Sequence, residues 1–428
     1  MPQTAGSKVS GWWVKAKSFL SPALRQRGAA KGLAALAASA AVSNFLLIAA
    51  SPLLTRLYSP EQFGIAAVFI SLFSIFAVVA NLRLEQAIPL PDSDSEAYAL
   101  TCASAAISLL VGVTIGVLFF VYDDAISVFF RIPALGRYWW LLSVGIILIG
   151  FYQAAVLWAV RTGAYSTIAQ TKIIQAVGML AIQAVFYKFG AIILVFGQLA
   201  GQSLGSLRLF LATIRRHDAY RSGVIVSRLK TVSWKYRKFP LVSSGGALIN
   251  AMGLSLTVLL MTKFFGAEVG GWYLMAERIV FAPAQLLAQA VGQIYLGETA
   301  KKLRSGENAR SAYYFYFKRL SLVGIIIYPI LAYGALIFFE TIFGEEWAQS
   351  GIYAAILAPA AFTQFAIVPI SSTLNLLGKQ HLQLCWDIFR FLSIGTTIVS
   401  AAYFHLSALE TVVTISAVFS VTYFLHFI

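Results

Sequence analysis

The chain is poor in the residues that build metal sites and disulfides. Its 428 residues include two cysteines and four histidines. Cys102 and Cys385 both fall inside apolar stretches, where a thiol serves as a small apolar side chain, and the histidines are scattered along the sequence. These residues therefore predict no disulfide framework and no metal site.

Charge is also scarce. Charged residues make up 11% of the chain against 59% hydrophobic ones, and the mean hydropathy is +0.78, which excludes an ordinary soluble domain. Runs of about 20 apolar residues cross the hydrocarbon layer of a membrane, and twelve such stretches fill the sequence. They predict an all-α polytopic membrane protein with helices near 30–53, 62–82, 97–121, 136–160, 166–187, 190–213, 240–263, 269–295, 314–339, 348–376, 380–404 and 408–428.

The cations sort to alternate gaps between these stretches. If the N-terminus is cytoplasmic, 23 of the 32 lysines and arginines lie in inside segments. The positive-inside rule therefore predicts that both termini are cytoplasmic. The net charge of +15 reflects topology and contact with anionic inner-leaflet lipids, and it does not indicate nucleic acid. At the outer helix ends, an aromatic belt is predicted from Trp139, Trp140, Trp272 and Trp347.

A twelve-residue motif occurs twice, 207 positions apart. Leu53–Gly64 reads LLTRLYSPEQFG, and Leu260–Gly271 reads LMTKFFGAEVGG. Each copy joins the first and second helices of a six-helix block at the outer face. Because six is even, both blocks are expected to face the same way, as a parallel repeat of the kind seen in secondary transporters. The alternative is a chance similarity between two apolar hairpins. The predicted parts are a basic cytoplasmic leader (1–29), an N-lobe (30–213), a basic cytoplasmic elbow (214–239) and a C-lobe (240–428).

Two adjacent charges lie deep in the predicted eighth helix. Glu277 and Arg278 are about ten residues from its start, near the membrane midplane at 1.5 Å per residue. Each charge costs roughly 2.5–3.5 kcal/mol on insertion scales, and neighbours on a helix point about 100° apart, so they do not simply neutralise each other. We expect Arg278 to face a water-filled cavity open to an anion. The alternative is an arginine paired with a neighbouring helix for packing alone.

Other polar residues within the helices have two interpretations each. Asp387 and Arg390 are three residues apart, so an internal ion pair explains both. Arg83, at the inner end of the second helix, either reaches the headgroups or meets an incoming phosphate. Asn44 and Asn250 either bind sugar hydroxyls or join helices together.

Of three further polar residues, two are expected to be structural and one has two interpretations. Arg161 ends the fourth helix and is predicted to be a positive-inside anchor, and Lys172 is predicted to reach the nearby membrane surface. Gln175, like the asparagines, is expected either to bind a sugar or to join helices.

Several longer motifs resemble one family. LLTRLYSPEQFG followed by LRLEQAIPLP (Leu82–Pro91) is similar to the opening of bacterial Wzx-type oligosaccharide flippases, in the polysaccharide-transporter branch of the multidrug/oligosaccharidyl-lipid/polysaccharide (MOP) exporter superfamily. YLMAERIVFAPAQLLAQAVGQIY (Tyr273–Tyr295) and PISSTLNLLGKQ (Pro369–Gln380) agree with it. The resemblance covers roughly residues 35–395. Glu277 departs from it, because a neutral residue such as Gln is expected there.

The resemblance implies two six-helix lobes in a V around a central cavity. It implies a flippase, not an enzyme, that moves undecaprenyl-diphosphate-linked oligosaccharide across the bacterial inner membrane by alternating access. The product would feed lipopolysaccharide or exopolysaccharide assembly, with a polysaccharide polymerase and chain-length proteins as partners. The expected substrate residues are Arg278 and Asn44 with Asn250 in the cavity, Arg83 at the inner mouth, and Arg56 and Lys263 at the outer mouth. For Arg56 and Lys263 the alternative is anchoring of the outer loops.

Transport of this kind needs a driving force. The membrane potential pushes a diphosphate anion outward, by about 2.3 kcal/mol per charge per 100 mV. The rival is antiport of H⁺ or Na⁺, with Glu277 or Asp387 as the coupling residue. No other cofactor is expected.

Three other classes of membrane protein would need charged groups that this sequence does not place where they are expected. A cation-coupled multidrug exporter of the same superfamily would carry acids in its first and seventh helices, and there are none between Lys31 and Thr55 or between Pro240 and Thr262. A membrane polymerase or glycosyltransferase needs a catalytic carboxylate or an arginine-rich outer loop, and the longest outer gap, 122–135, is too short. A lipid II flippase would carry charges deep in its first helix.

Overall fold

The computed structural model describes residues 32, 35–215, 229, 231–305, 308 and 310–427, and within them the chain forms helices and connecting turns. The all-α fold class is therefore confirmed. The predicted leader (1–29) and most of the predicted elbow (214–239) lie outside the described residues.

The first half begins with the helix Ala35–Leu57, whose last segment is α2 (Ser51–Leu57). It continues with α3 (Pro60–Ala77), η1 (Leu84–Ala87), α4 (Asp94–Val121), α5 (Asp123–Phe130), α6 (Ala134–Arg137), α7 (Trp139–Arg161), α8 (Tyr165–Val185), η2 (Tyr187–Phe189) and α9 (Ala191–Arg215).

The second half begins with η3 (Phe239–Ser243), which runs into α11 (Ser244–Phe265). It continues with α12 (Ala267–Val280), α13 (Ala282–Arg304), α14 (Arg310–Phe343), η4 (Glu345–Trp347), α15 (Ala348–Ile367), η5 (Val368–Ile370), α16 (Thr373–Leu376), α17 (Gln380–Tyr403) and α18 (Ala408–Phe427).

Ten helices in the described part of the chain are long and apolar enough to cross a membrane. The other two predicted spans are 190–213, which corresponds to α9, and 269–295, which is divided into α12 and α13. The prediction of a single helix over 269–295 was wrong, because the chain breaks at Phe281 between α12 and α13. Pro283 opens α13; it has no N–H to donate, and its ring would clash with the carbonyl of Ile279 in a continuous helix. The number of crossings stays a prediction.

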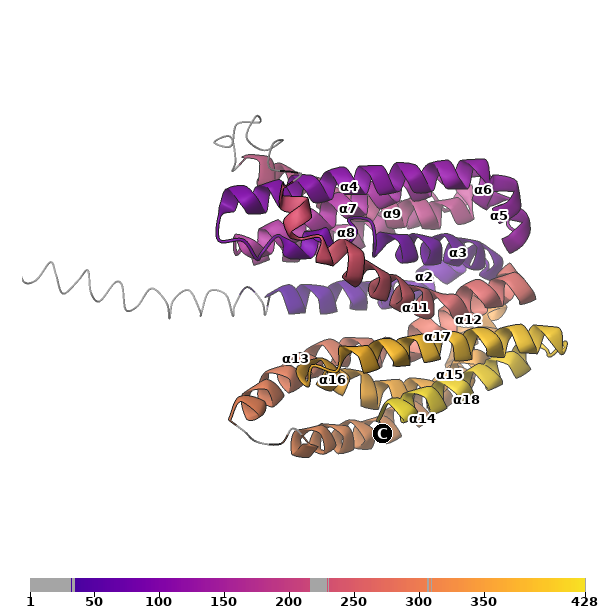
Figure 1. The fold of residues 1–428 in the computed structure, drawn as a ribbon. Helices are drawn as coiled ribbons and strands as arrows, with labels where there is room; N and C mark the ends of the chain where they lie inside the picture. Colours follow the sequence, from indigo (N-terminus) through magenta and orange to yellow (C-terminus); the bar gives the residue numbers. More distant parts are fainter. Residues whose placement is uncertain are drawn as a thin grey trace, which may run out of the picture.

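Figure 1 shows the helices of the two halves gathered in separate groups, with α2, α3, α11 and α12 between them. In the first half α4 packs on α7 and α8 packs on α9, while in the second half α15 packs on both α14 and α18. The halves meet chiefly where α3 lies against α12 and α11. The V shape and the lobe boundaries stay predictions.

The contact between α3 and α12 depends on two glycines. A Cβ on Gly64 would lie 1.7 Å from the carbonyl oxygen of Ala267, and a Cβ on Gly271 would lie 1.9 Å from that of Pro60. Positions 267 and 271 follow 60 and 64 by the same offset of 207 that relates the two copies of the sequence motif. The motif therefore contacts its own copy reciprocally, as in an isologous two-fold interface.

Trp347 completes this contact between the halves. Its Nε1 donates to the carbonyl oxygen of Thr55 at 3.0 Å, and its ring meets the edge of Phe63 at a centroid distance of 5.0 Å. The side chain is 1% exposed. The prediction that Trp347 belongs to the outer aromatic belt was therefore wrong, because a position at a helix end does not tell which side of the helix faces lipid.

Candidate functional site

A cavity of about 300 Å³ lies between the first helix and the α12–α13 break. One wall comes from the first half of the chain and the other from the second half, so the cavity depends on how the halves approach. Its lining residues are Asn44, Leu47, Ile48, Leu274, Glu277, Arg278 and Ala282.

Arg278 lies in the last turn of α12, beside the helix break. The carbonyl end of a helix carries partial negative charge, which favours a cation at this position. The three ion pairs among the described residues include neither Arg278 nor the adjacent Glu277. Both charges thus line the cavity without an ion-pair partner in that part of the chain. The structure brings Arg278 and Asn44 together at one cavity, and what they bind stays a prediction.

A second cavity, of about 230 Å³, lies within the first half, between the first helix, α8 and α9. Asn44 and Leu47 line both cavities, so the two adjoin across one turn of the first helix. The lining includes Lys172, whose predicted place is the membrane surface. Its full set is Ala40, Ser43, Asn44, Leu47, Lys172, Gln175, Ala176, Met179, Gln198 and Gln202.

Sequence reasoning missed this second cavity, although a signal for it existed. Lys172 and Gln175 are three residues apart, and Gln198 and Gln202 are four apart, so each pair shares one face of its helix. Two consecutive apolar helices that each carry a polar face indicate a shared polar space. Because Lys172 was interpreted on its own, the pattern that it forms with Gln175, Gln198 and Gln202 was not recognised.

Close packing of α8 on α9 fixes part of this lining. A Cβ on Gly201 would lie 2.7 Å from the backbone oxygen of Gln175, so only glycine allows this approach. The Gln175 side chain donates from Nε2 to the carbonyl oxygen of Gln202 at 3.1 Å. About two helix turns further along α8, Gln183 donates from Nε2 to the carbonyl oxygen of Leu194 at 2.8 Å. These two amides join the helices.

Asn250 and Asp387 belong to a different cluster, between α11 and α17. Asn250 donates from Nδ2 to Asp387 Oδ1 at 3.0 Å, and Arg390 forms an ion pair with the same oxygen at 3.2 Å. Arg390 also donates to the hydroxyl of Tyr423 at 3.3 Å and lies over the ring of Trp386. The predicted Asp387–Arg390 ion pair is confirmed. Neither Asn250 nor Asp387 is among the residues lining the two cavities.

Arg83 lies in a strained turn after α3, outside both cavity linings. Leu82 and Arg83 both have left-handed backbone conformations, with φ of 49° and 61°. The turn is held by Asn81, which donates to the carbonyl oxygen of Gly150 at 2.9 Å. The neighbouring Glu85 is 5% exposed, and burial raises its pKa, although the charge of Arg83 acts in the opposite direction.

Arg56 and Lys263, the predicted outer-mouth cations, have different surroundings. Arg56 is exposed at the end of α2. Lys263, at the equivalent position of α11, places its Nζ 3.2 Å from the ring centroid of Phe129 in α5. This cation–π contact links the second half to the first, which matches the anchoring alternative for Lys263. Neither cation lines the two cavities.

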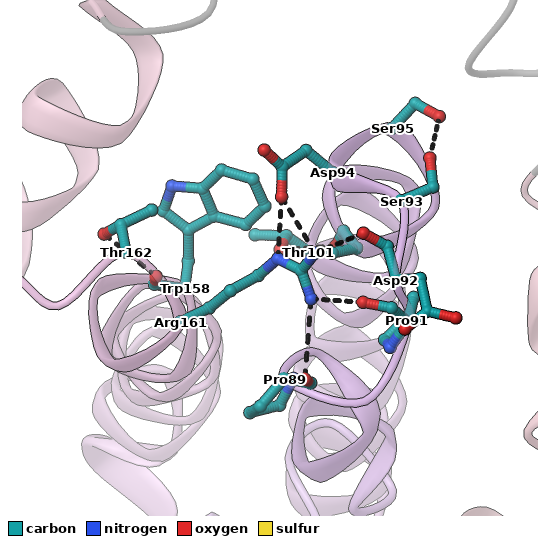
Figure 2. Close-up of polar contacts among 11 residues, drawn as sticks. Pro89, Pro91, Asp92, Ser93, Asp94, Ser95, Thr101, Trp158, Arg161 and Thr162 are labelled. Carbon is teal, nitrogen blue, oxygen red and sulfur yellow. Dashed lines mark hydrogen bonds and ion pairs between the residues drawn. The ribbon is translucent and has the colours of Figure 1, made fainter. Parts of the chain in front are cut away.

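Arg161 holds the segment between η1 and α4 (Figure 2). Its guanidinium donates to Asp94 Oδ1 from Nε at 3.0 Å and from Nη2 at 2.8 Å. It also donates to the carbonyl oxygens of Pro91 at 2.5 Å, Asp92 at 3.3 Å and Pro89 at 3.4 Å. Arg161 therefore fixes a connecting loop, and its donors are occupied within the chain.

A protein-family model described as "Polysaccharide biosynthesis protein" matches residues 53–351 of the chain. The chain belongs to this family. It is 25% identical over 324 residues to the teichuronic acid biosynthesis protein TuaB of Bacillus subtilis (strain 168), covering 74% of this chain and 65% of that protein. It is 26% identical over 158 residues to the lipopolysaccharide biosynthesis protein WzxC of Escherichia coli (strain K12), covering 36% and 31%. The matched region is thus less than two thirds of either relative.

Solved structures show the same fold at low sequence identity. An inward-facing multidrug resistance MATE transporter of the MOP superfamily matches with a TM-score of 0.68 and 16% identity, covering 90% of this chain and 93% of that one. The lipid II flippase MurJ, in an inward closed conformation, matches with a TM-score of 0.70 and 12% identity, covering 92% and 86%. The predicted resemblance to Wzx-type proteins of polysaccharide biosynthesis is confirmed by the family model and by the similarity to WzxC, and the solved structures confirm the fold.

Proposed function

We propose that this polysaccharide biosynthesis protein moves a lipid-linked oligosaccharide from the cytoplasmic to the outer leaflet of a bacterial inner membrane. The single observation that carries the proposal is the cavity between the two halves, where Arg278 has no ion-pair partner among the described residues. The family places the chain in polysaccharide biosynthesis. The solved neighbours are transporters and a flippase, which favours transport over catalysis.

The chemistry of the cavity fits a glycolipid diphosphate such as undecaprenyl diphosphate. A guanidinium offers paired donors that match phosphate oxygens and keeps its charge at any physiological pH. Asn44, across the cavity, has a carboxamide that both donates and accepts hydrogen bonds. The lipid tail would remain in the bilayer between the halves. The glycan would then pass to the periplasmic polymerase and chain-length proteins of the same assembly system.

Alternating access requires that the halves separate at one end while they close at the other. The α3–α12 contact, with Gly64 against Ala267, supplies a closure at the predicted outer end. Arg278 is eleven residues along α12 from Ala267, about 16 Å at 1.5 Å per residue. We propose that outward opening separates this contact and exposes Arg278 to the other side.

The test uses proteoliposomes with an undecaprenyl-diphosphate trisaccharide in the leaflet equivalent to the cytoplasmic one. A membrane-impermeant sugar-oxidising reagent reports its arrival on the other side. Wild type is compared with Arg278→Ala and Arg278→Lys, and with Arg319→Ala, which removes an exposed arginine of α14 as the matched control.

We expect transport by wild type and Arg319→Ala, and a loss of tenfold or more in Arg278→Ala, because hydrogen bonds to a charged group contribute about 1.5–3 kcal/mol. Arg278→Lys should fall between them, since it keeps the charge and loses the paired donors. Transport that is unchanged in Arg278→Ala would remove Arg278 from the site. A lack of transport by wild type would contradict the proposed function.

A second candidate is a cation-coupled multidrug exporter of the same superfamily. The observation that favours it is Glu277, an acid in the lining of the cavity. Export of a cationic dye that depends on a pH gradient and is lost in Glu277→Gln would support this candidate. Glycolipid transport that persists in Glu277→Gln without any pH gradient would exclude coupling through this residue.

A further inference from the structure

The cavity within the first half has the groups that a glycan needs. Its polar lining consists of carboxamides, one hydroxyl and one ammonium, contributed by the first helix, α8 and α9. Carboxamides and hydroxyls both donate and accept hydrogen bonds, as sugar hydroxyls require of a partner. The lining contains no carboxylate, so the charge of Lys172 is not balanced within it.

Lys172 belongs to the cavity side of α8. The lipid side of this helix is marked by exposed apolar residues, Ile173 at 38% and Val177 at 51% exposure. Lys172 instead shares the cavity lining with Ala176 and Met179, four and seven residues further on, which is the spacing of one helix face. It therefore does not serve as a lipid-facing anchor.

The position of Lys172 makes its charge costly. It is seven residues after the first residue of α8, about 10 Å into a candidate membrane span. None of the three ion pairs among the described residues involves it. A charge within the membrane that lines a polar cavity is by default a functional residue, and its missing partner has the opposite sign. The missing partner of Lys172 is an anion.

The neighbouring cavity indicates which anion this is. Asn44 and Leu47 line both cavities, so a ligand held at Arg278 continues directly toward Lys172. A diphosphate is followed by its sugars in a glycolipid, and Arg278 already serves the phosphate charge. The group that reaches Lys172 is then part of the glycan. The amides of Asn44 and Gln198, beside one ammonium, fit a sugar that carries hydroxyls and a carboxylate.

We propose that this cavity receives the glycan and that the transported oligosaccharide contains an acidic sugar, whose carboxylate pairs with Lys172. The proposal rests on the proposed function and specifies its substrate class. An anionic phospholipid headgroup offers the same chemistry, so the experiment has to separate the two sources.

The experiment compares two undecaprenyl-diphosphate trisaccharides that differ at one group. One carries a uronic acid, and the other carries the hexose obtained by reducing that carboxylate to a primary alcohol. Both are assayed in proteoliposomes of phosphatidylcholine alone and with phosphatidylglycerol added. The proteins are wild type, Lys172→Gln, Lys172→Arg and the control Lys188→Gln, which removes an exposed lysine of η2.

For wild type and Lys188→Gln, we expect the KM for the acidic glycolipid to be at least tenfold lower than the KM for the neutral one, in both types of vesicle. The reason is the free energy of a hydrogen bond between two charged groups. Lys172→Arg should keep this preference, and Lys172→Gln should lose it while still transporting the neutral glycolipid. Equal KM values for the two glycolipids in wild type would overturn the inference and leave the proposed function standing. This comparison needs no variant, so it holds even if Lys172→Gln does not fold.

Three other results would overturn the inference. If Lys172→Gln kept the lower KM for the acidic glycolipid, another group would bind the carboxylate. A Lys172 effect seen only with phosphatidylglycerol, and for both glycolipids equally, would assign the lysine to a lipid headgroup. Transport of neither glycolipid by wild type would overturn the proposed function together with this inference.

Discussion

Arg278 and Arg390 are both arginines within the helices of the second half, and their surroundings differ in kind. Arg390 is 4% exposed and is held by Asp387, the hydroxyl of Tyr423 and the ring of Trp386. Arg278 lines a cavity and takes part in none of the described ion pairs. A buried pair fixes helices, whereas a charge left toward a cavity is available to a ligand.

The Asp387–Arg390 pair gives a first prediction at this scale. Both side chains are at most one tenth exposed, so Asp387→Asn leaves a buried guanidinium without its counter-charge, and we expect a loss of about 3–5 kcal/mol in stability. The double variant Asp387→Leu/Arg390→Met should be more stable than Asp387→Asn, since it removes both charges. Thermal unfolding in detergent measures both. If Asp387→Asn kept full stability but lost a pH-gradient requirement for transport, Asp387 would be a coupling residue instead.

Glu85 gives a second prediction, in the turn after α3 and outside the candidate spans. Burial raises the pKa of Glu85 in the folded protein, so the folded state binds its proton more tightly than the unfolded state. Stability should therefore fall as the pH rises from the unfolded pKa, about 4.3, to the raised folded pKa. Glu85→Gln should flatten this part of the curve of unfolding temperature against pH. A wild-type curve that rises over the same window would show that other carboxylates dominate.

At the scale of elements, the break between α12 and α13 and the contact between α3 and α12 are linked. Both involve α12, which is the first part of the helix predicted over 269–295. The break places Arg278 beside a helix end, and the contact fixes the other end of α12 against Pro60 and Gly64. We therefore expect movement of α12 at the contact to be transmitted to the cavity.

A single methyl group tests the contact. In Gly64→Ala the new Cβ would lie 1.7 Å from the carbonyl oxygen of Ala267, so α3 and α12 have to separate. We expect a cost of about 1–3 kcal/mol to this closed arrangement and more labelling of a cysteine introduced at Thr55. Labelling uses an impermeant maleimide added from outside, with Cys102 and Cys385 replaced by alanine.

The control is Gly334→Ala in α14, where nothing lies within 4 Å of the new Cβ. A helical Gly→Ala exchange there should be neutral or slightly stabilising. Equal labelling of Thr55→Cys in the Gly64→Ala and Gly334→Ala backgrounds would mean that the α3–α12 contact is not the outer closure.

For the whole molecule, the proposed transport needs a driving force. An inside-negative potential of 100 mV contributes about 2.3 kcal/mol per charge moved across the full membrane, so two net phosphate charges gain about 4–5 kcal/mol. We expect an imposed inside-negative potential to accelerate outward transport in proteoliposomes, and a reversed potential to slow it. A transport rate that does not change with the potential would contradict this expectation. Either protein charges that move with the substrate, such as Arg278, would then offset the phosphate charges, or an ion gradient through Glu277 would drive the cycle.

Much of the fold could be predicted from the sequence, because a membrane imposes a simple rule on it. Every backbone group must be satisfied internally within the hydrocarbon layer, so long apolar runs become helices, and a described helix lies in each of the twelve predicted stretches. The repeat of the motif at Leu53–Gly64 and Leu260–Gly271 was read from the sequence, but the reciprocal contact at Gly64 and Gly271 was not predicted from it. An ion pair three residues apart, as at Asp387 and Arg390, is equally local.

The candidate site depended on distant parts of the chain. Asn44 and Asn250 were equivalent candidates by sequence, yet Asn44 lines both cavities and Asn250 is bound to Asp387. Lys172 was expected at the membrane surface and lines a cavity, and Trp347 was expected in the outer aromatic belt and is buried between the halves. The sequence by itself determined which residues carry charge and which segments are helical, because both follow from local chemistry. Only the tertiary structure decided which helix faces meet lipid, a neighbouring helix or a cavity, because that depends on contacts between residues far apart in the chain.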